Sequence, residues 1–219
     1  MQLLTQKQQT NSFMRKSFLF ILSALLILTS CAPRIYQDPQ AYSIAQSHKI
    51  IAILPPNVAI NAKRSIEAEA QKEQQRTESL NFQKEMYSWL LHRKTQGKLS
   101  VEIQDIETTN ALLRKINQED LLTMTPTEMG KVLKVDGIVK SNFSISNPMS
   151  PGAAIAAAVL IGVIGNTDKT TADLSLYDVN TEKMIWNYNH KASGRFTNAG
   201  SLVDQLMKNA SKKFPHIKR

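Results

Sequence analysis

Cysteine is almost absent from this chain, in which Cys31 is the single cysteine among 219 residues. One thiol excludes a disulfide within the chain and a metal site built from several thiolates. The four histidines, His48, His92, His190 and His216, lack the HExxH spacing of a zinc protease. The sequence therefore predicts neither a bound metal nor a cofactor.

Motifs for nucleophilic catalysis and for phosphate binding are missing as well. There is no G-x-S-x-G elbow for a serine nucleophile. The stretch Gly162 to Thr170 has glycines ahead of a lysine, but no glycine directly precedes Lys169, so the Walker spacing is not met. Glu67 and Glu69 fall in a polar helical stretch, and we interpret Asp136 as a turn residue rather than a general base. The prediction is a protein that is not an enzyme.

An uncharged run near the N-terminus, Ser17 to Ser30, reads SFLFILSALLILTS and follows Arg15 and Lys16. A basic start, an apolar core and small residues before a cleavage point are typical of a secretory signal. The run is shorter than the ~20 residues that a transmembrane helix needs. We therefore predict a signal peptide over residues 1–30, and we favour Met14, which opens the basic region, as the true start.

Leu28-Thr29-Ser30-Cys31 resembles the lipobox of bacterial lipoproteins, in which an aliphatic residue and two small residues precede a cysteine. The resemblance implies cleavage between Ser30 and Cys31 and attachment of palmitate-type acyl chains at Cys31. Two or more acyl chains hold a protein stably on a bilayer. A signal anchor with an incidental cysteine is the alternative. Because Ala32 rather than Asp follows Cys31, we expect the outer membrane, facing the periplasm.

Basic residues outnumber acidic ones, with 27 Lys and Arg against 18 Asp and Glu. Loss of residues 1–30 would remove Lys7, Arg15 and Lys16 and lower the net charge from +9 to +6. A moderate positive charge suits contact with anionic lipid headgroups or peptidoglycan carboxylates. No nucleic-acid-binding motif accompanies the charge, so no nucleic acid is expected as a partner.

A short tether is predicted between the lipid anchor and the folded body. Residues 31–47 contain Pro33 and Pro39, which disfavour regular structure. A tether this short would keep the body near the membrane surface. The folded body is expected over residues 48–215.

The hydrophobic pattern of that body predicts alternating strands and helices. The expected strands are 49–54, ended by Pro55-Pro56, then 99–106, 135–145, 170–179 and 183–190, the last two forming a hairpin. The expected helices are 62–94, 109–116 (capped by Thr109-Asn110), 125–133 and 202–213 (capped by Ser201). The sharpest start signal is Thr125-Pro126-Thr127-Glu128, a capping box with proline at the first helical position. The order predicts a single-domain, mixed-sheet α/β sandwich.

The first half of the 62–94 helix is strongly polar, and we interpret it as a solvated face, with a partner-binding extension as the alternative. The second half carries apolar residues at helical spacing and is expected to dock on the sheet. These residues are Phe82, Met86, Trp89 and Leu90.

Four features resemble the small periplasmic α/β domain of several envelope lipoproteins. They are the apolar strand ending at Pro55-Pro56, the Lys-Val-Asp-Gly-Ile-Val element around Asp136, the strand-turn-strand from Leu176 to Lys183, and Ile185-Trp186 after it. This domain occurs in Lpo-type activators of penicillin-binding proteins, CsgG-type curli secretion lipoproteins and a group of lipoproteins of uncharacterised function. The chain has neither the long Pro-rich linker of the first nor the barrel hairpins of the second, so it is most similar to the third. The resemblance implies a non-enzymatic domain that binds partners and often oligomerises.

Residues 152–165, GAAIAAAVLIGVIG, are an uncharged insertion between two predicted strands. As a helix the segment would be about 21 Å long, short of the ~30 Å hydrocarbon core of a bilayer. A stripe of small residues every fourth position allows close helix approach. We hypothesise an interaction segment that contacts another subunit or the membrane; a buried helix or hairpin on the sheet is the alternative. Its key residues are Ala154, Ala158, Leu160 and Gly162.

Together these features predict a membrane-anchored periplasmic lipoprotein that acts as an accessory or binding protein in a cell envelope assembly. Its expected partners are the membrane, through the acyl chains, and an envelope protein, with a homo-oligomer as a further option. One alternative is a subunit of an oligomeric export or secretion complex. The other is a peptidoglycan-processing enzyme.

Overall fold

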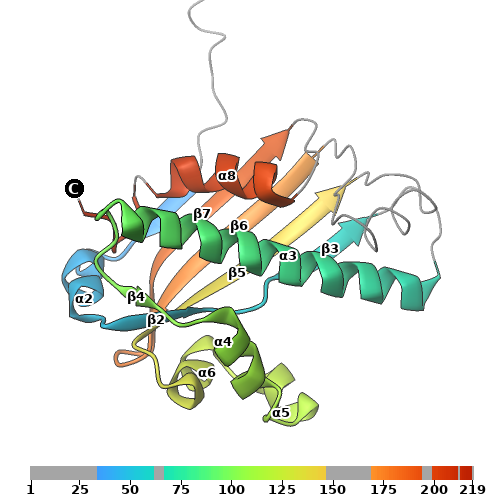
Figure 1. Ribbon diagram of the computed structural model, residues 1–219, viewed down its shortest axis with the longest axis horizontal. Coiled ribbons are helices and arrows are strands. Elements are labelled where there is room, and N and C mark those ends of the chain that lie inside the picture. Colours follow the sequence, from blue (N-terminus) through green and yellow to red (C-terminus); the bar gives the residue numbers. More distant parts are fainter. Residues whose placement is uncertain (1–33, 62–66, 147–168, 194–198, 212, 219) are drawn as a thin grey trace, which may run out of the picture. The chain divides into compact units, whose positions relative to one another are not determined.

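One mixed sheet forms the centre of the structure, a computed structural model that describes residues 34–61, 67–146, 169–193, 199–211 and 213–218 (Figure 1). The strand order is β1-β7-β6-β5-β2-β4, and β3 lies beside β5. This confirms the mixed α/β class predicted from the sequence. The described strands are β1 (Arg34–Gln37), β2 (Ile50–Ile53), β3 (Asn57–Asn61), β4 (Glu102–Ile103), β5 (Gly137–Ser146), β6 (Lys169–Asp178) and β7 (Lys183–Ser193).

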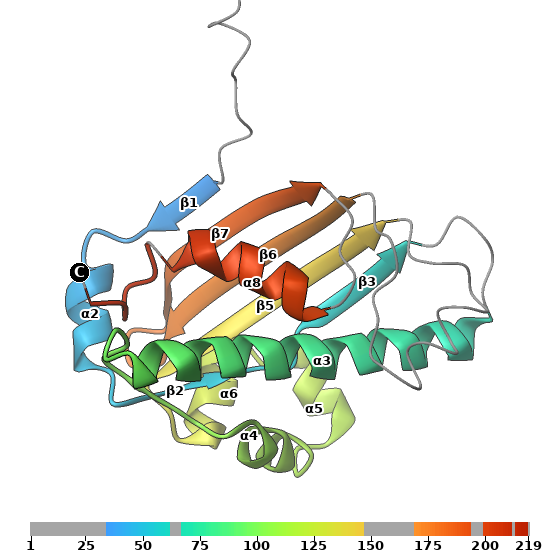
Figure 2. The same ribbon diagram turned by 45° about the horizontal axis from the view of Figure 1, so that its top comes forward.

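Helices cover both faces of this sheet, and α3 and α8 lie on one face while α4 and α6 pack on the other beside β2 (Figures 1 and 2). Two hydrophobic cores result. Ile138 and Val139 are neighbours in β5 and therefore point to opposite faces, Val139 into the larger core and Ile138 into the smaller one. The described helices are α2 (Ala41–Ser47), α3 (Ala68–Thr95), α4 (Ile106–Leu113), α5 (Gln118–Thr123), α6 (Pro126–Leu133) and α8 (Ala199–Ala210).

The larger core lies under α3 and α8. Phe82 of α3 stacks on Phe143 of β5 with ring centroids 4.0 Å apart. Phe82, Met86 and Leu90 are buried as predicted, whereas Trp89 is half-buried beneath the Arg93 guanidinium. In α8, the inward positions predicted from the sequence are also buried: Leu202, Leu206, Met207 and Ala210. Within the described residues, no helix combines the length and apolar character needed to cross a bilayer.

Strands β2 and β3 are two halves of one strand broken at Pro55-Pro56. Both run parallel to β5, with Ile53 opposite Val139 and Asn57 opposite Asn142. Between these two pairs, the β2–β3 side has one residue more than the β5 side. One extra residue on one strand is the defining feature of a β-bulge. Proline cannot donate to a sheet ladder, so the prediction that the first strand ends here is confirmed. β3 is not predicted from the sequence, because five residues with only two buried apolar positions, Val58 and Ile60, are a weak signal by themselves.

Residues 34–47 are folded, so the irregular tether predicted over residues 31–47 is wrong for this part. Arg34–Gln37 forms an edge strand antiparallel to β7, and α2 follows after a turn at Pro39. Pairing with β7 and burial of Ala41 and Ala45 override the local effect of proline. Residues 31–33 lie outside the described residues.

Local helix signals are confirmed where the cap is complete. The Thr125 hydroxyl accepts from the Glu128 amide at 3.2 Å, and the Glu128 carboxylate accepts from the Thr125 amide at 2.7 Å. The predicted cap of α4 is wrong. That helix begins at Ile106 because the Asp105 carboxylate accepts from the Thr108 amide at 2.9 Å, while Thr109 lies inside the helix.

Other boundaries also differ from the prediction. Helix α8 begins at Ala199, so Ser201 lies within it rather than at its cap. The strand predicted over 99–106 pairs regularly only at Glu102–Ile103, and α5 is an additional short helix. The β6–β7 hairpin is confirmed. A register shift at Leu176/Tyr177 leaves Ile185 of β7 without a partner on β6, and the consecutive residues Ile185 and Trp186 are both buried in the larger core.

Candidate functional site

The site residues predicted from the sequence all fall outside the described part of the chain. This applies to the cleavage and lipidation site, Ser30 and Cys31, and to the proposed interaction segment, Ala154, Ala158, Leu160 and Gly162. They remain predictions. The described residues offer two other features, an apolar groove and a buried histidine cluster.

The groove lies between the middle of α3 and the helices α4 and α5, with a volume of about 590 Å³. A side pocket of about 210 Å³ shares three lining residues with it, Pro55, Leu113 and Leu121. Volumes of this size suit a small ligand or a few anchoring side chains of a partner. The groove is thus a concave surface available for recognition among the described residues.

The broken strand shapes one wall of the groove. Pro55 stands at the break between β2 and β3 and lines both cavities. Helix α3 is fixed to this break because the Ser79 hydroxyl donates to the Pro56 carbonyl at 2.6 Å. The break therefore forms one wall of the groove and also fixes α3, which forms the opposite wall.

A reciprocal amide pair closes the bottom of the groove. The Gln83 amide donates to the Asn110 side-chain oxygen at 3.0 Å, and Asn110 donates back to Gln83 at 2.8 Å. Gln83 also donates to the Ile53 carbonyl at 2.8 Å. Because these amides already have partners, they offer a ligand little hydrogen bonding, and recognition rests on the apolar lining.

Two large apolar side chains on the helices that line the groove are exposed. Leu80 of α3 is 44% exposed and lines the groove, and Leu122 of α5, next to the lining Leu121, is 81% exposed. Leaving such side chains in water is unfavourable, and a concentration of them usually marks an interaction site. The groove therefore has apolar anchors on two facing helices.

The charged lining of the groove is cationic. Arg76 and Arg114 line it, and Lys140 lines the side pocket, whereas no carboxylate lines either cavity among the described residues. Arg76 has only a long contact of 3.9 Å with Glu73, and both side chains are largely exposed. Such a pair is weak in water, so Arg76 is available to an anionic group on a ligand.

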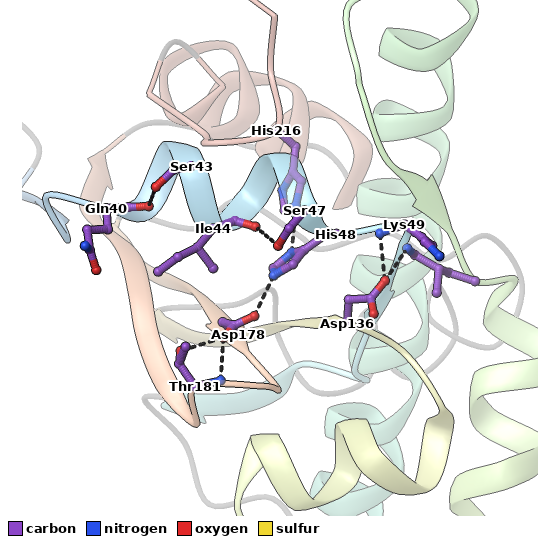
Figure 3. A network of polar contacts seen from close by, with 11 residues as sticks. Gln40, Ser43, Ile44, Ser47, His48, Lys49, Asp136, Asp178, Thr181 and His216 are labelled. Carbon is purple, nitrogen blue, oxygen red and sulfur yellow. Dashed lines mark hydrogen bonds and ion pairs between the residues drawn. The ribbon is translucent and has the colours of Figure 1, made fainter.

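The second feature is a buried cluster of His48, Asp178 and His216 (Figure 3). His48 Nε2 lies 2.8 Å from Asp178 Oδ1, and His48 Nδ1 lies 3.0 Å from His216 Nε2. An ionised carboxylate can only accept, so His48 donates to Asp178 from Nε2. The cluster joins the start of β2, the end of β6 and the C-terminal segment.

Burial controls the charges in this cluster. It lowers the pKa of His216 to about 3, with the neighbouring His48 as a second cause. For Asp178, burial acts to raise the pKa, but hydrogen bonds from Thr181 and His48 lower it below its ordinary value. His216 is therefore neutral and Asp178 is ionised at neutral pH.

Gly137 makes room for the cluster. A Cβ atom at this position would lie 2.9 Å from His48 Nδ1 and 3.0 Å from the Ile51 side chain. The preceding residue, Asp136, accepts from the Lys49 and Ile50 amides at 2.7 and 3.0 Å. The interpretation of Asp136 as a structural residue agrees with these bonds, since it fixes the start of β2 against β5.

The histidine cluster has the residue types of a general base, but its surroundings favour a structural role. The side chains of His48 and Asp178 are 0% and 1% exposed, and His216 is fully buried. A substrate has no access to groups this deeply covered. Within the described residues, moreover, no group of three or more His, Cys, Asp or Glu side chains is arranged to hold a metal ion.

No protein-family model matches the chain, and no curated protein matches it. Among solved structures, the PelC dodecamer from Paraburkholderia phytofirmans is similar, with 12% identity over 86% of this chain and 98% of that chain and a TM-score of 0.41. Lipoprotein GNA1162 from Neisseria meningitidis matches with 11% identity over 75% of this chain and 94% of that chain, with a TM-score of 0.39. The LpoB C-terminal domain from Salmonella enterica matches with 11% identity over 71% of this chain and 93% of that chain, with a TM-score of 0.33. Likenesses this distant carry no argument about activity or partner.

Proposed function

We propose that this chain is a lipid-anchored envelope protein that binds a partner protein through the groove between α3, α4 and α5. The groove carries the proposal, because the amides of Gln83 and Asn110 are already paired and Leu80 in its lining is exposed. This combination suits an apolar anchor from another protein better than it suits chemistry on a small polar substrate.

The charges of the groove indicate the chemistry of the partner. An apolar anchor would sit against Leu80, Leu113 and Leu121, and acidic residues beside it would pair with Arg76 and Arg114. Arginine favours carboxylates because its planar guanidinium can bind both oxygens. The expected partner segment is therefore a short, acidic and amphipathic stretch.

The lipid anchor belongs to the same proposal. The signal and lipobox support cleavage before Cys31 and acylation of its thiol, and Ala32 supports sorting to the outer membrane on its periplasmic side. β1 begins three residues after Cys31. The partner would therefore be an envelope protein within reach of the membrane surface.

Site-specific photo-crosslinking in living cells tests the groove. A benzophenone amino acid at Leu122 is expected to give a crosslinked adduct that disappears when Leu80→Asp is added. The matched control is Val132, an apolar side chain of α6 with 41% exposure that lines neither cavity. The proposal fails if probes at Leu122 and Val132 give the same adduct, or if Leu80→Asp leaves the adduct unchanged in a folded protein.

Charge reversal tests the partner's acidity separately. Arg76→Glu with Arg114→Glu is expected to weaken the Leu122 adduct, more so at low salt, because exposed charges are screened by ions. A complex that is insensitive to both arginines would retain the groove but exclude an acidic partner.

A further inference from the structure

Two chain connections reach the sheet at the same end. β1 is antiparallel to β7 with Arg34 opposite Asn189, so β1 begins toward the end of β7. Ser146 at the end of β5 pairs with Lys169 at the start of β6. In Figure 2 the arrowheads of β3, β5 and β7 point to one end of the sheet, and β1, which runs the opposite way, begins on the side of that end. We call this the Arg34 end of the sheet.

The first of these connections is the short stretch before β1. Only three residue steps separate Cys31 from Arg34. Even fully extended, three steps span at most ~11 Å. The polar headgroup layer of one leaflet is itself roughly 5–8 Å thick. An acylated Cys31 would therefore hold the start of β1 at the bilayer surface.

The second connection leaves β5 at Ser146 and enters β6 at Lys169. Its sequence includes the uncharged stretch 152–165. Two parts of the chain are expected to favour lipid: Cys31, through acylation, and the stretch 152–165, through its composition. Both are thus attached at the Arg34 end. This coincidence comes from strand direction alone and needs no assumption about how either connection is folded.

The side chains at this end suit a membrane interface. Arg34 lies opposite Asn189, so it shares a sheet face with Lys191, two residues further along β7, and both are exposed. On β1, Ile35, next to Arg34, is 37% exposed. Cations such as Arg34 and Lys191 bind anionic headgroups.

We propose that the Arg34 end of the sheet rests on the bilayer surface, with Arg34 and Lys191 in contact with anionic headgroups. This orientation rests on the lipid anchor of the proposed function. The opposite end, with His48 and the β6–β7 turn, then points away from the membrane. The groove lies beside β2, four strand spacings or roughly 19 Å across the sheet from β1.

Depth-dependent fluorescence quenching tests this orientation in the full lipidated protein. An acylated Cys31 has no free thiol, so a single new cysteine can be labelled with a fluorophore at Lys191 or Lys183. Lys191 and Lys183 lie at opposite ends of β7, ~27 Å apart. In vesicles with one third phosphatidylglycerol and nitroxide-labelled headgroups, we expect at least threefold stronger quenching at position 191 than at position 183.

Equal quenching at positions 191 and 183, or stronger quenching at 183, would overturn the orientation while leaving the anchor and the groove in place. Mass spectrometry of the mature N-terminus is the companion measurement. An N-terminus without acyl chains would overturn both the anchor and this orientation, whereas the Leu122 crosslink tests the groove independently. Arg34→Glu should reduce quenching at position 191, and Lys183→Glu, the matched control, should not.

Discussion

Nδ1 of His48 lies 3.0 Å from Nε2 of His216, although 168 residues separate them in the chain. This contact joins the segment that follows the N-terminal strand to the C-terminal segment, and Asp178 ties both to the end of β6. Because His216 is neutral and buried, the contact makes the fold sensitive to acid.

Acid is expected to weaken the fold through His216. Its pKa is about 3 in the folded protein and near 6.5 when exposed, so between these values the unfolded chain binds more protons. Stability from this residue is present above pH 6.5 and is lost as pH falls toward 3. The loss between pH 7 and pH 5 is about 2 kcal/mol. Urea unfolding of wild type and His216→Gln at both pH values measures it, and an unchanged pH slope in the variant would contradict it.

Glu78 is expected to act in the opposite direction. This glutamate of α3 is 1% exposed, one of its carboxylate oxygens has no hydrogen-bond partner, and burial raises its pKa to about 7. Stability from this residue falls as pH rises from 4.5 to about 7, because the folded form holds the proton longer. Glu78→Gln should therefore stabilise the protein at pH 8, by roughly 1–2 kcal/mol, and not at pH 5.

The control for Glu78 is Glu73→Gln, on the same helix but largely exposed, which should change stability by no more than a few tenths of a kcal/mol. Thermal and urea unfolding at pH 5 and pH 8 measure the change in stability of both variants. A Glu78→Gln variant that is less stable than wild type at pH 8 would show that the carboxylate has a favourable partner.

Gly137→Ala is expected to destabilise the protein by roughly 1–3 kcal/mol, because the new Cβ would press on the His48 ring and the Ile51 side chain. A double-mutant cycle with His48→Ala isolates the contact. The alanine at 137 should cost less in that background, since the ring is gone. Equal costs in both backgrounds would assign the loss to the backbone or to Ile51 instead.

Cys31→Ala is expected to abolish acyl labelling and leave the precursor uncleaved or the protein detached from membranes. Metabolic labelling with a palmitate analogue measures acylation, and density-gradient fractionation should place the wild-type protein with the outer membrane. Labelling that persists in the variant would refute the lipobox, and recovery of wild type with the inner membrane would refute the sorting inferred from Ala32.

The segment 152–165 stays a proposed contact outside the monomer. Leu160→Asp is expected to leave the fold intact, by circular dichroism, and to reduce vesicle flotation or oligomer size. Ala158→Leu tests close helix approach alone, since it adds bulk without charge. A folded Leu160→Asp protein with unchanged flotation and oligomeric state would contradict the proposal, and an unfolded one would favour a core role.

Elements with local signals could be predicted from the sequence, and those that depend on distant partners could not. The Thr125 capping box and the β6–β7 hairpin are encoded within a few residues. β1 is exposed along most of its length and exists because it pairs with β7, from Arg34 opposite Asn189 onward. No local pattern in a stretch with Pro39 indicates that pairing.

The groove escaped prediction for the same reason. Its walls come from Pro55, from Leu80 on α3 and from Leu121 on a helix that the pattern did not reveal. The one local signal is Leu80, an apolar residue that interrupts a polar helical stretch and stays exposed. The histidine cluster had no local signal at all, since 130 residues separate His48 from Asp178.

The placement of β1 also determines how the fold would respond to mechanical tension. A pull on an anchor at Cys31 would act along the strand axis, so the hydrogen bonds between β1 and β7 would be loaded in shear and would share the force. β1 has only four pairs with β7, Arg34 to Gln37. Once they part, the tension passes through α2 to His48, whose bonds to Asp178 and His216 lie deep in the protein. The edge strand would thus yield first and spare the sheet.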